Sequence, residues 1–202
     1  MIYFTADTHF GHGNIITLCQ RPFDSVQEMD ETLIARWNQR VGPEDTVYHL
    51  GDLTLGTAEQ AQRVIARLNG TIMILGDPYH HDGRWLQWRQ GMQPDIRSAS
   101  DRSLIILSPI HLFHCEHPWG GKRLSVVLSH FPMFSWHKMH HGSWHLFGHS
   151  HGRTRRGLLC LDVGVDCWGY APVSLDEIFA AMRPKQEALA AQGHHYPIKE
   201  EV

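Results

Sequence analysis

Aspartate and histidine side chains directly follow several short apolar runs in this sequence. Carboxylate and imidazole groups bind borderline and hard divalent cations, and two such cations can together promote displacement at a phosphorus atom. One zinc ion takes four ligands, and the sequence offers more candidate ligands than that. Two metal ions that share a carboxylate fit the number of candidates better. The candidate ligands are Asp7, His9, Asp52, Asp77, His130, His149 and His151.

The three aspartates each follow a predicted strand. These strands are the short apolar runs at residues 2–5, 46–50 and 71–75 in the first part of the chain. Ligand crevices in α/β sheets open at the carboxyl ends of the strands. Side chains that lie far apart in the sequence are therefore expected to meet in one crevice.

Two helices are predicted between these strands. Capping boxes begin them at Ser25 and Thr57, and the spacing of apolar residues carries them to about Arg40 and Leu68. This alternation of strands and helices predicts an α/β protein in which parallel strands are joined by crossover helices.

The second half of the chain predicts a second, more mixed sheet that packs on the first, because its apolar runs have short or irregular connections. A further capping box at Ser174 begins a helix that is expected to end near Pro184. We expect one domain over residues 1–183 and a peripheral C-terminal tail over residues 184–202. The predicted strands of the second sheet are 104–107, 111–115, 124–129, 145–147 and 159–163.

The composition excludes several classes of protein. Hydrophobic residues make up 42% and charged residues 19% of the 202 residues, which is too apolar for a disordered chain. The formal net charge of −3 argues against a broadly basic nucleic-acid coat. No apolar run approaches the length of about 20 residues that a membrane span needs. The four cysteines form no C-x-x-C pair, so we expect reduced thiols and a cytoplasmic protein.

Several sequence blocks occur in the order of a known family. They are Phe4–His12, Leu50-Gly51-Asp52, Ile74-Leu75-Gly76-Asp77, Ser129-His130-Phe131-Pro132 and Gly148-His149-Ser150-His151-Gly152, and the stretch 162–166 adds to them. Over about residues 1–182 the chain resembles the calcineurin-like metallophosphoesterases, specifically the small bacterial members. The resemblance implies a four-layer α/β/β/α sandwich with two mixed β-sheets, two divalent metal ions and hydrolysis of phosphate esters.

The resemblance also assigns the ligands. It implies that Asp52 is shared by both ions, that the first ion is held by Asp7, His9 and His151, and that the second is held by His130, His149 and Asp77. The chain departs from the family at Asp77, where the family usually has asparagine. A third carboxylate lowers the net positive charge of the site, which weakens its attraction for a phosphate.

Four more residues are candidates for contact with the substrate. The family's catalytic histidine corresponds to either His80 or His81, and His81 is favoured because Asp82 follows it directly. His12 is predicted to contact a bound phosphate, with a structural role as the alternative. Arg153 is also predicted to contact a phosphate. The alternative is that it lies in a solvated turn and contacts no substrate.

The main hypothesis is a cytoplasmic, binuclear metal-dependent phosphoesterase. It would hydrolyse a small phosphodiester or nucleotide through a metal-bridging hydroxide, although the motifs leave monoester and diester substrates open. Mn²⁺ is the expected ion, with Fe²⁺, Zn²⁺ or Ni²⁺ as alternatives. Two other hypotheses are a metal-binding scaffold with little turnover, suggested by Asp77, and a nucleic-acid-processing phosphoesterase, suggested by Arg153, Arg155 and Arg156. The net charge does not support a nucleic-acid partner, and the oligomeric state is left open.

Overall fold

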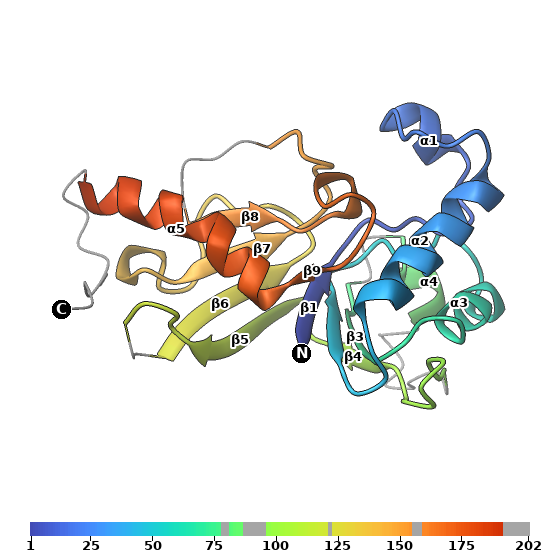
Figure 1. Cartoon of the computed structure of the whole chain (residues 1–202), viewed down its shortest axis with the longest axis horizontal. Coiled ribbons are helices and arrows are strands. Elements are labelled where there is room, and N and C mark those ends of the chain that lie inside the picture. The colour runs from blue at the N-terminus through green and yellow to red at the C-terminus, as the bar shows by residue number, and fades with distance from the viewer. Residues whose placement is uncertain (78–80, 87–95, 121–122, 155–158, 192–202) are drawn as a thin grey trace.

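The computed structural model describes residues 1–77, 81–86, 96–120, 123–154 and 159–191. It shows the expected mixed α/β architecture with two mixed β-sheets (Figure 1). Within these residues, no helix is both long enough and apolar enough to cross a membrane.

The first sheet has five strands in the order β4-β3-β2-β1-β9. The first four run parallel to one another, and β9 pairs antiparallel with β1. The carboxyl ends of β1, β2 and β3 therefore point to the same edge. The bounds are β1 Ile2–Thr5, β2 Thr46–His49, β3 Thr71–Leu75, β4 Ile105–Leu107 and β9 Val173–Ser174.

Two helices cover one face of the first sheet. Helix α2 (Val26–Arg40) begins where the Ser25 hydroxyl accepts a hydrogen bond from the Glu28 amide, and α3 (Ala58–Ile65) begins at a complete capping box of Thr57 and Gln60. Both N-termini are where the sequence predicts them, because a cap is a local signal. Helix α3 ends three residues earlier than expected. Apolar side chains on both helices pack in one core with the first sheet: Met29, Leu33, Trp37, Ala61, Ile65, Val47, Ile72 and Ile74.

The second sheet has four strands in the order β5-β6-β7-β8 and packs on the other face of the first sheet. Strands β5 and β6 are antiparallel, and β6, β7 and β8 are parallel. The ring of Phe113 on β5 contacts those of Phe4 and Tyr48 in the first sheet, at centroid distances of 5.4 and 5.3 Å. The bounds are β5 Ile110–Glu116, β6 Arg123–Ser129, β7 Trp144–Phe147 and β8 Cys160–Asp162.

The remaining helical segments are short, apart from α5 (Leu175–Ala191), which lies across β7 and β8 (Figure 1). The ring of Phe179 on α5 contacts that of Trp144 on β7 at a centroid distance of 5.9 Å. Among the described residues the short segments are α1 Asn14–Leu18, α4 Gly83–Leu86 and the 3₁₀ turns at Met139–His141 and Val165–Cys167.

Two expectations from the sequence are wrong. The run at 104–107 was expected in the second sheet, but β4 pairs in parallel with β3 and forms the edge of the first sheet. The helix that begins after Ser174 was expected to end near Pro184, but α5 continues to Ala191 with Pro184 inside it. The side chains of Gln186 and Leu189 beyond the proline are buried, so tertiary packing outweighs the lost backbone hydrogen bond.

Glu177 is expected to stabilise the start of α5. Its carboxylate accepts hydrogen bonds from the amide and the hydroxyl of Ser174, at 2.9 and 2.8 Å, and pairs with Arg40. The hydrogen bond from Arg40 is the main cause that lowers the pKa of Glu177 to about 2. Replacing Glu177 with alanine should lower the free energy of unfolding at neutral pH by about 1 kcal/mol, since the carboxylate is partly exposed.

The pH dependence of this effect has a definite sign. Because the folded-state pKa is depressed, the contribution is complete above the ordinary glutamate pKa and is lost as the pH falls toward 2. Urea denaturation at neutral and acidic pH measures it. Glu187→Ala, which breaks an exposed pair with Arg183, is the control and should change little. An equal loss in both variants, or a loss that does not shrink on acidification, would contradict the assignment.

Candidate metal centre

Candidate ligands from both sheets converge at the carboxyl ends of their strands. Asp7 and Asp52 follow β1 and β2 of the first sheet, and His130 and His149 follow β6 and β7 of the second. Three overlapping groups form, and within each group one candidate ligand atom per residue lies within 4.8 Å of the others. The groups are Asp7 with His9 and His151, His9 with Asp52 and His81, and Asp52 with His130 and His149.

Five of these residues have a left-handed backbone conformation. The φ angles are 58° at Asp7, 52° at His9, 58° at Asp52, 64° at His149 and 46° at His151. Residues other than glycine adopt this region rarely, and each case costs about 1–3 kcal/mol. Strained residues concentrate at functional sites. The turns that cost this energy are the ones that direct the candidate ligands toward one another.

Hydrogen bonds between the loops maintain this arrangement. The His149 amide donates to both carboxylate oxygens of Asp7, at 2.9 Å each, and thereby links the two sheets. Within the first sheet the Asp7 amide donates to the Gly51 carbonyl at 3.0 Å, and the His9 amide donates to the Asp52 carbonyl at 2.9 Å. Hydrogen bonds that involve the backbone thus position the candidate ligands.

His9 has the surroundings of a metal ligand. Both of its ring nitrogens are buried, and among the described residues neither has a hydrogen-bond partner. Burial, together with the nearby His151 and Arg21, lowers the pKa of His9 far below its usual value, so the ring is neutral. An unpartnered buried polar atom costs about 1–3 kcal/mol, and a metal ion would satisfy one of these nitrogens.

The two buried carboxylates also suit a cation. Burial raises the pKa of Asp7 well above its usual value, against the opposing effect of the His149 amide. Burial likewise raises the pKa of Asp52, although His81 opposes it. A divalent cation would reverse both shifts, because it favours the ionised form. The donor set of buried carboxylates and a neutral imidazole therefore fits metal ions.

Two histidines are oriented by hydrogen bonds at Nδ1. His130 donates from Nδ1 to the Leu50 carbonyl at 3.1 Å, and its Nε2 lies 3.5 Å from Oδ2 of Asp52. His151 uses Nδ1 for the carboxylate of Asp166 at 2.7 Å. In each ring Nε2 is therefore the nitrogen that would bind a metal ion, and such hydrogen bonds commonly orient metal-binding histidines.

His81 and His12 lie at the rim of this centre. The His81 amide donates to Oδ1 of Asp52 at 3.2 Å, and its Nε2 lies 3.9 Å from Oδ2 of the same residue. The imidazole rings of His81 and His12 each lie 5.5 Å from that of His9 and 6.3 Å from each other. The His81 side chain is 48% exposed, so it can reach both the centre and a substrate.

Asp82 positions the segment that carries His81. The buried Asp82 carboxylate accepts hydrogen bonds from the amides of Leu53 and Thr54, at 2.9 and 3.0 Å, and from the indole of Trp85 at 3.0 Å. It thus attaches this segment to the loop that follows Asp52. In the sequence analysis Asp82 served only to favour His81 over His80. The structural role of Asp82 was not predicted.

Three other predicted site residues are not placed in these groups. Asp77 follows β3 directly and is partly buried, but within the described part of the chain it belongs to none of the three groups. Arg153 is exposed and donates to the Leu18 carbonyl at 2.6 Å. His80 lies outside the described residues, as do Arg155 and Arg156.

Sequence reasoning missed two acidic residues that support the centre. Asp162 at the end of β8 accepts hydrogen bonds from the Ser150 hydroxyl and the Gly152 amide, at 2.6 and 2.9 Å, and so anchors the loop of His149 and His151. Asp166 contacts His151 itself, as described above. Both lie in the stretch 162–166, and Asp162 ends an apolar run as the predicted ligands do, which is the signal that could have identified it.

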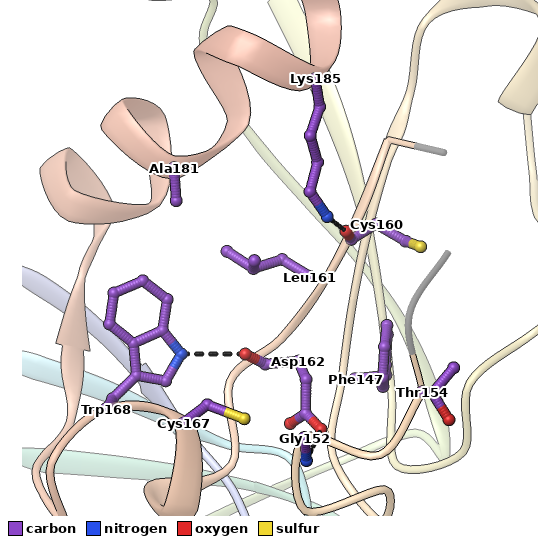
Figure 2. A pocket seen from close by; sticks show the side chains of 10 residues that line it. All are labelled: Phe147, Gly152, Thr154, Cys160, Leu161, Asp162, Cys167, Trp168, Ala181 and Lys185. Atoms are coloured by element: carbon purple, nitrogen blue, oxygen red, sulfur yellow. Dashed lines mark hydrogen bonds between the residues drawn. The ribbon is translucent and has the colours of Figure 1, made fainter. Parts of the chain in front are cut away.

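A hollow of about 550 Å³ lies on the α5 side of this loop (Figure 2). Its lining is mainly apolar and includes Leu161, Trp168 and Ala181. The Lys185 ammonium donates to the Cys160 carbonyl at one end, and the Trp168 indole donates to the Asp162 carbonyl at 2.9 Å at the other. None of the histidines of the centre lines this hollow, although Asp162 and Gly152, which anchor their loop, do.

Gly148 is packed too tightly for any side chain. A Cβ atom there would lie 2.5 Å from Cβ of Ala6 and 2.9 Å from Oδ2 of Asp7. Gly148→Ala should therefore displace Asp7, lower the free energy of unfolding by about 2 kcal/mol and reduce the stabilisation by added Mn²⁺. Urea denaturation with and without Mn²⁺ measures both effects. Gly13→Ala is the control, because the atom nearest to a Cβ at that position, Cβ of Val26, would lie 3.9 Å away. Unchanged stability and Mn²⁺ response in Gly148→Ala would contradict this packing.

Comparison with known proteins identifies relatives without a described activity. No family model matches the chain. Over 76 residues the chain is 49% identical to the uncharacterized protein MJ1445 of Methanocaldococcus jannaschii, a segment that covers 37% of this chain and 43% of that protein. Over 200 residues it is 28% identical to the Gene 66 protein of Mycobacterium phage L5, covering 88% of this chain and 91% of the phage protein.

A solved structure has a similar fold. The chain aligns with a protein of unknown function, AQ665 from Aquifex aeolicus, with a TM-score of 0.60 and 24% sequence identity. The alignment covers 90% of this chain and 98% of that protein. At this identity the likeness concerns the fold alone, so the function must be argued from the site.

Proposed function

We propose that this chain is a metal-dependent phosphoesterase of the calcineurin-like type, with that family's four-layer α/β/β/α fold and two divalent metal ions. The observation that carries the proposal is the position of Asp52. Its carboxylate belongs to a group with His9 on one side and to a group with His130 and His149 on the other. One carboxylate shared between two histidine-containing groups is an arrangement that suits a pair of neighbouring metal ions.

The proposed ligands are the ones that the resemblance implies, and the candidate groups in the structure support them. Asp7, His9 and His151 would hold the first ion, His130 and His149 the second, and Asp52 both. Mn²⁺ remains the proposed ion, because mixed carboxylate and imidazole donors suit it, with Fe²⁺, Zn²⁺ or Ni²⁺ as alternatives. Asp77 remains a proposed further ligand of the second ion, as the resemblance implies. When bound, the ions supply positive charge at the phosphoryl group and activate water.

The chain's own residues would perform three tasks. The buried Asp7 and Asp52 and the unpartnered His9 form a centre that attracts cations and, through them, a phosphate. His81, whose backbone amide donates to Asp52 and whose side chain is partly exposed, would donate a proton to the leaving oxygen of the ester. His12, whose ring lies beside those of His9 and His81, would contact a phosphate oxygen.

The proposed substrate is a small phosphodiester or nucleotide. The centre lies where the loops of the two sheets meet, and His81 and His149 are exposed at its surface. We place the nucleic-acid alternative second, because Arg153 already donates a hydrogen bond to the Leu18 carbonyl. The arginines that follow Arg153 lie outside the described residues.

Metal binding and turnover test the proposal together. Protein freed of metal with a chelator is dialysed against Mn²⁺, and the bound ions are counted. The same protein is assayed with bis-p-nitrophenyl phosphate and p-nitrophenyl phosphate. We expect two ions per chain and Mn²⁺-dependent hydrolysis that the chelator abolishes. Two bound ions without hydrolysis of either ester would favour the scaffold alternative, and no bound ion would overturn the metal centre itself.

A further inference from the structure

Arg21 and Asp166 form a buried ion pair directly behind the proposed first metal site. The Arg21 guanidinium donates from Nε and Nη2 to the two carboxylate oxygens of Asp166, at 2.8 Å each. Two parallel hydrogen bonds of this kind hold a carboxylate in one orientation. The Arg21 side chain is fully buried and that of Asp166 is 9% exposed, so solvent screens the pair little.

The same guanidinium also holds the loop that carries the first ligands. Nη2 of Arg21 donates to the Asp7 carbonyl at 2.6 Å, and Nη1 donates to the Thr8 carbonyl at 3.1 Å. These carbonyls lie in the turn between the ligand candidates Asp7 and His9. Arg21 is therefore bonded on one side to the backbone of the first ligand loop and on the other side to Asp166.

Asp166 in turn orients the third ligand of that site. Its Oδ2 lies 2.7 Å from Nδ1 of His151, and the rings of His151 and His9 stack at a centroid distance of 5.4 Å. With Nδ1 bonded to the carboxylate, Nε2 is the nitrogen that His151 can offer to a metal. A carboxylate partner also makes an imidazole a stronger metal donor than a carbonyl partner does. At the second site, Nδ1 of His130 donates to a backbone carbonyl, that of Leu50.

We propose that Arg21 and Asp166 are positioning residues that preorganise the first metal site, and that they act on it selectively. Arg21 holds the backbone of the turn between Asp7 and His9 in place. Asp166 fixes the orientation of the His151 ring. The second site, with His130 and His149, has no hydrogen bond to either residue among the contacts of the described chain. This inference rests on the proposed metal centre and assigns a role to two residues that were not among the predicted site residues.

The test measures metal affinity at the first site alone. His149→Ala removes a ligand of the second site, so this background should bind one ion per chain. Adding Asp166→Ala to it should weaken Mn²⁺ binding, measured by equilibrium dialysis, on the order of 100-fold, and adding Asp166→Asn on the order of 10-fold. Asparagine keeps an oxygen acceptor of the same shape, so the smaller loss is a partial rescue.

A second background reports on selectivity. With His151 changed to alanine, the first site is already damaged, and the remaining ion occupies the second site. Asp166→Ala should then change Mn²⁺ affinity less than twofold. Asp176→Asn is the control for charge in both backgrounds, because Asp176 is exposed on the first turn of α5. Urea denaturation of each metal-free variant checks the fold, and Co²⁺ absorption reports directly on ligand geometry at the occupied site.

Each outcome decides between hypotheses. Loss of affinity at the first site alone, with partial rescue by asparagine, supports the positioning role. Unchanged affinity at the first site overturns it, and so does an equal loss at both sites, which would indicate a general structural effect. If the unmodified protein binds no metal, the proposed function fails instead, and this outcome is distinct from both others.

Discussion

Asp52→Asn should abolish turnover and leave the protein folded. The change removes the negative charge that both proposed metal sites share but keeps the shape of the side chain. Each ion loses a charged ligand, so we expect weaker binding of both ions and a fall in kcat/KM on the order of 10³-fold or more, which corresponds to about 4 kcal/mol of transition-state stabilisation. Metal counting by dialysis and hydrolysis of bis-p-nitrophenyl phosphate measure the two effects.

The control for this variant is Asp24→Asn, the same change at an exposed position. It should retain both ions and full activity. The free energy of unfolding of metal-free Asp52→Asn should not fall, because burial already raises the pKa of this carboxyl. A variant at position 52 that keeps two tightly bound ions and its turnover would show that Asp52 is not the shared ligand.

His81→Ala should lower turnover mainly for esters with poor leaving groups. A proton donor matters most when the leaving oxygen is strongly basic, so kcat should fall on the order of 10²–10³-fold for a phenyl ester and much less for its p-nitrophenyl analogue. The metal content should not change. Measuring kcat over a series of aryl diesters gives the dependence on leaving-group basicity, which should become steeper in the variant.

This experiment separates two roles that the structure allows for His81. It forms one of the three candidate ligand groups with His9 and Asp52, and it is also the partly exposed histidine at the rim. Loss of a bound ion with a uniform fall across the ester series would assign His81 as a ligand instead of a proton donor. His140→Ala, an exposed histidine on a 3₁₀ turn, serves as the control and should behave like the unmodified protein.

The sequence by itself determined the features that depend on neighbouring residues. The caps at Ser25, Thr57 and Ser174 start helices where they were predicted, because a cap needs only a side chain and an amide three residues away. The ends of the strands are also marked by neighbouring residues, because an apolar run that stops at aspartate or histidine indicates the edge of a sheet. That rule predicts that side chains at the strand ends meet, and six of the candidate ligands do lie together: Asp7, His9, Asp52, His130, His149 and His151.

Sheet membership and the end of the last helix depended on the tertiary structure. The run at 104–107 has the same apolar character whichever sheet it joins, and only its pairing with β3 decides. Pro184 signals a helix end locally, but the burial of Gln186 and Leu189 on the far side keeps α5 intact. In both cases contacts with distant residues outweigh a local preference.

The supporting contacts of the proposed metal centre were decided by the tertiary structure alone. Arg21 and Asp166 are separated by 145 positions, and nothing in the sequence shows that their side chains meet. The left-handed turns at Asp7 and Asp52 are likewise unfavourable locally and exist because hydrogen bonds between the loops hold them. A ligand's chemical type can be recognised from the sequence, but its orientation is set by buried long-range hydrogen bonds, which leave no periodic or local pattern along the chain.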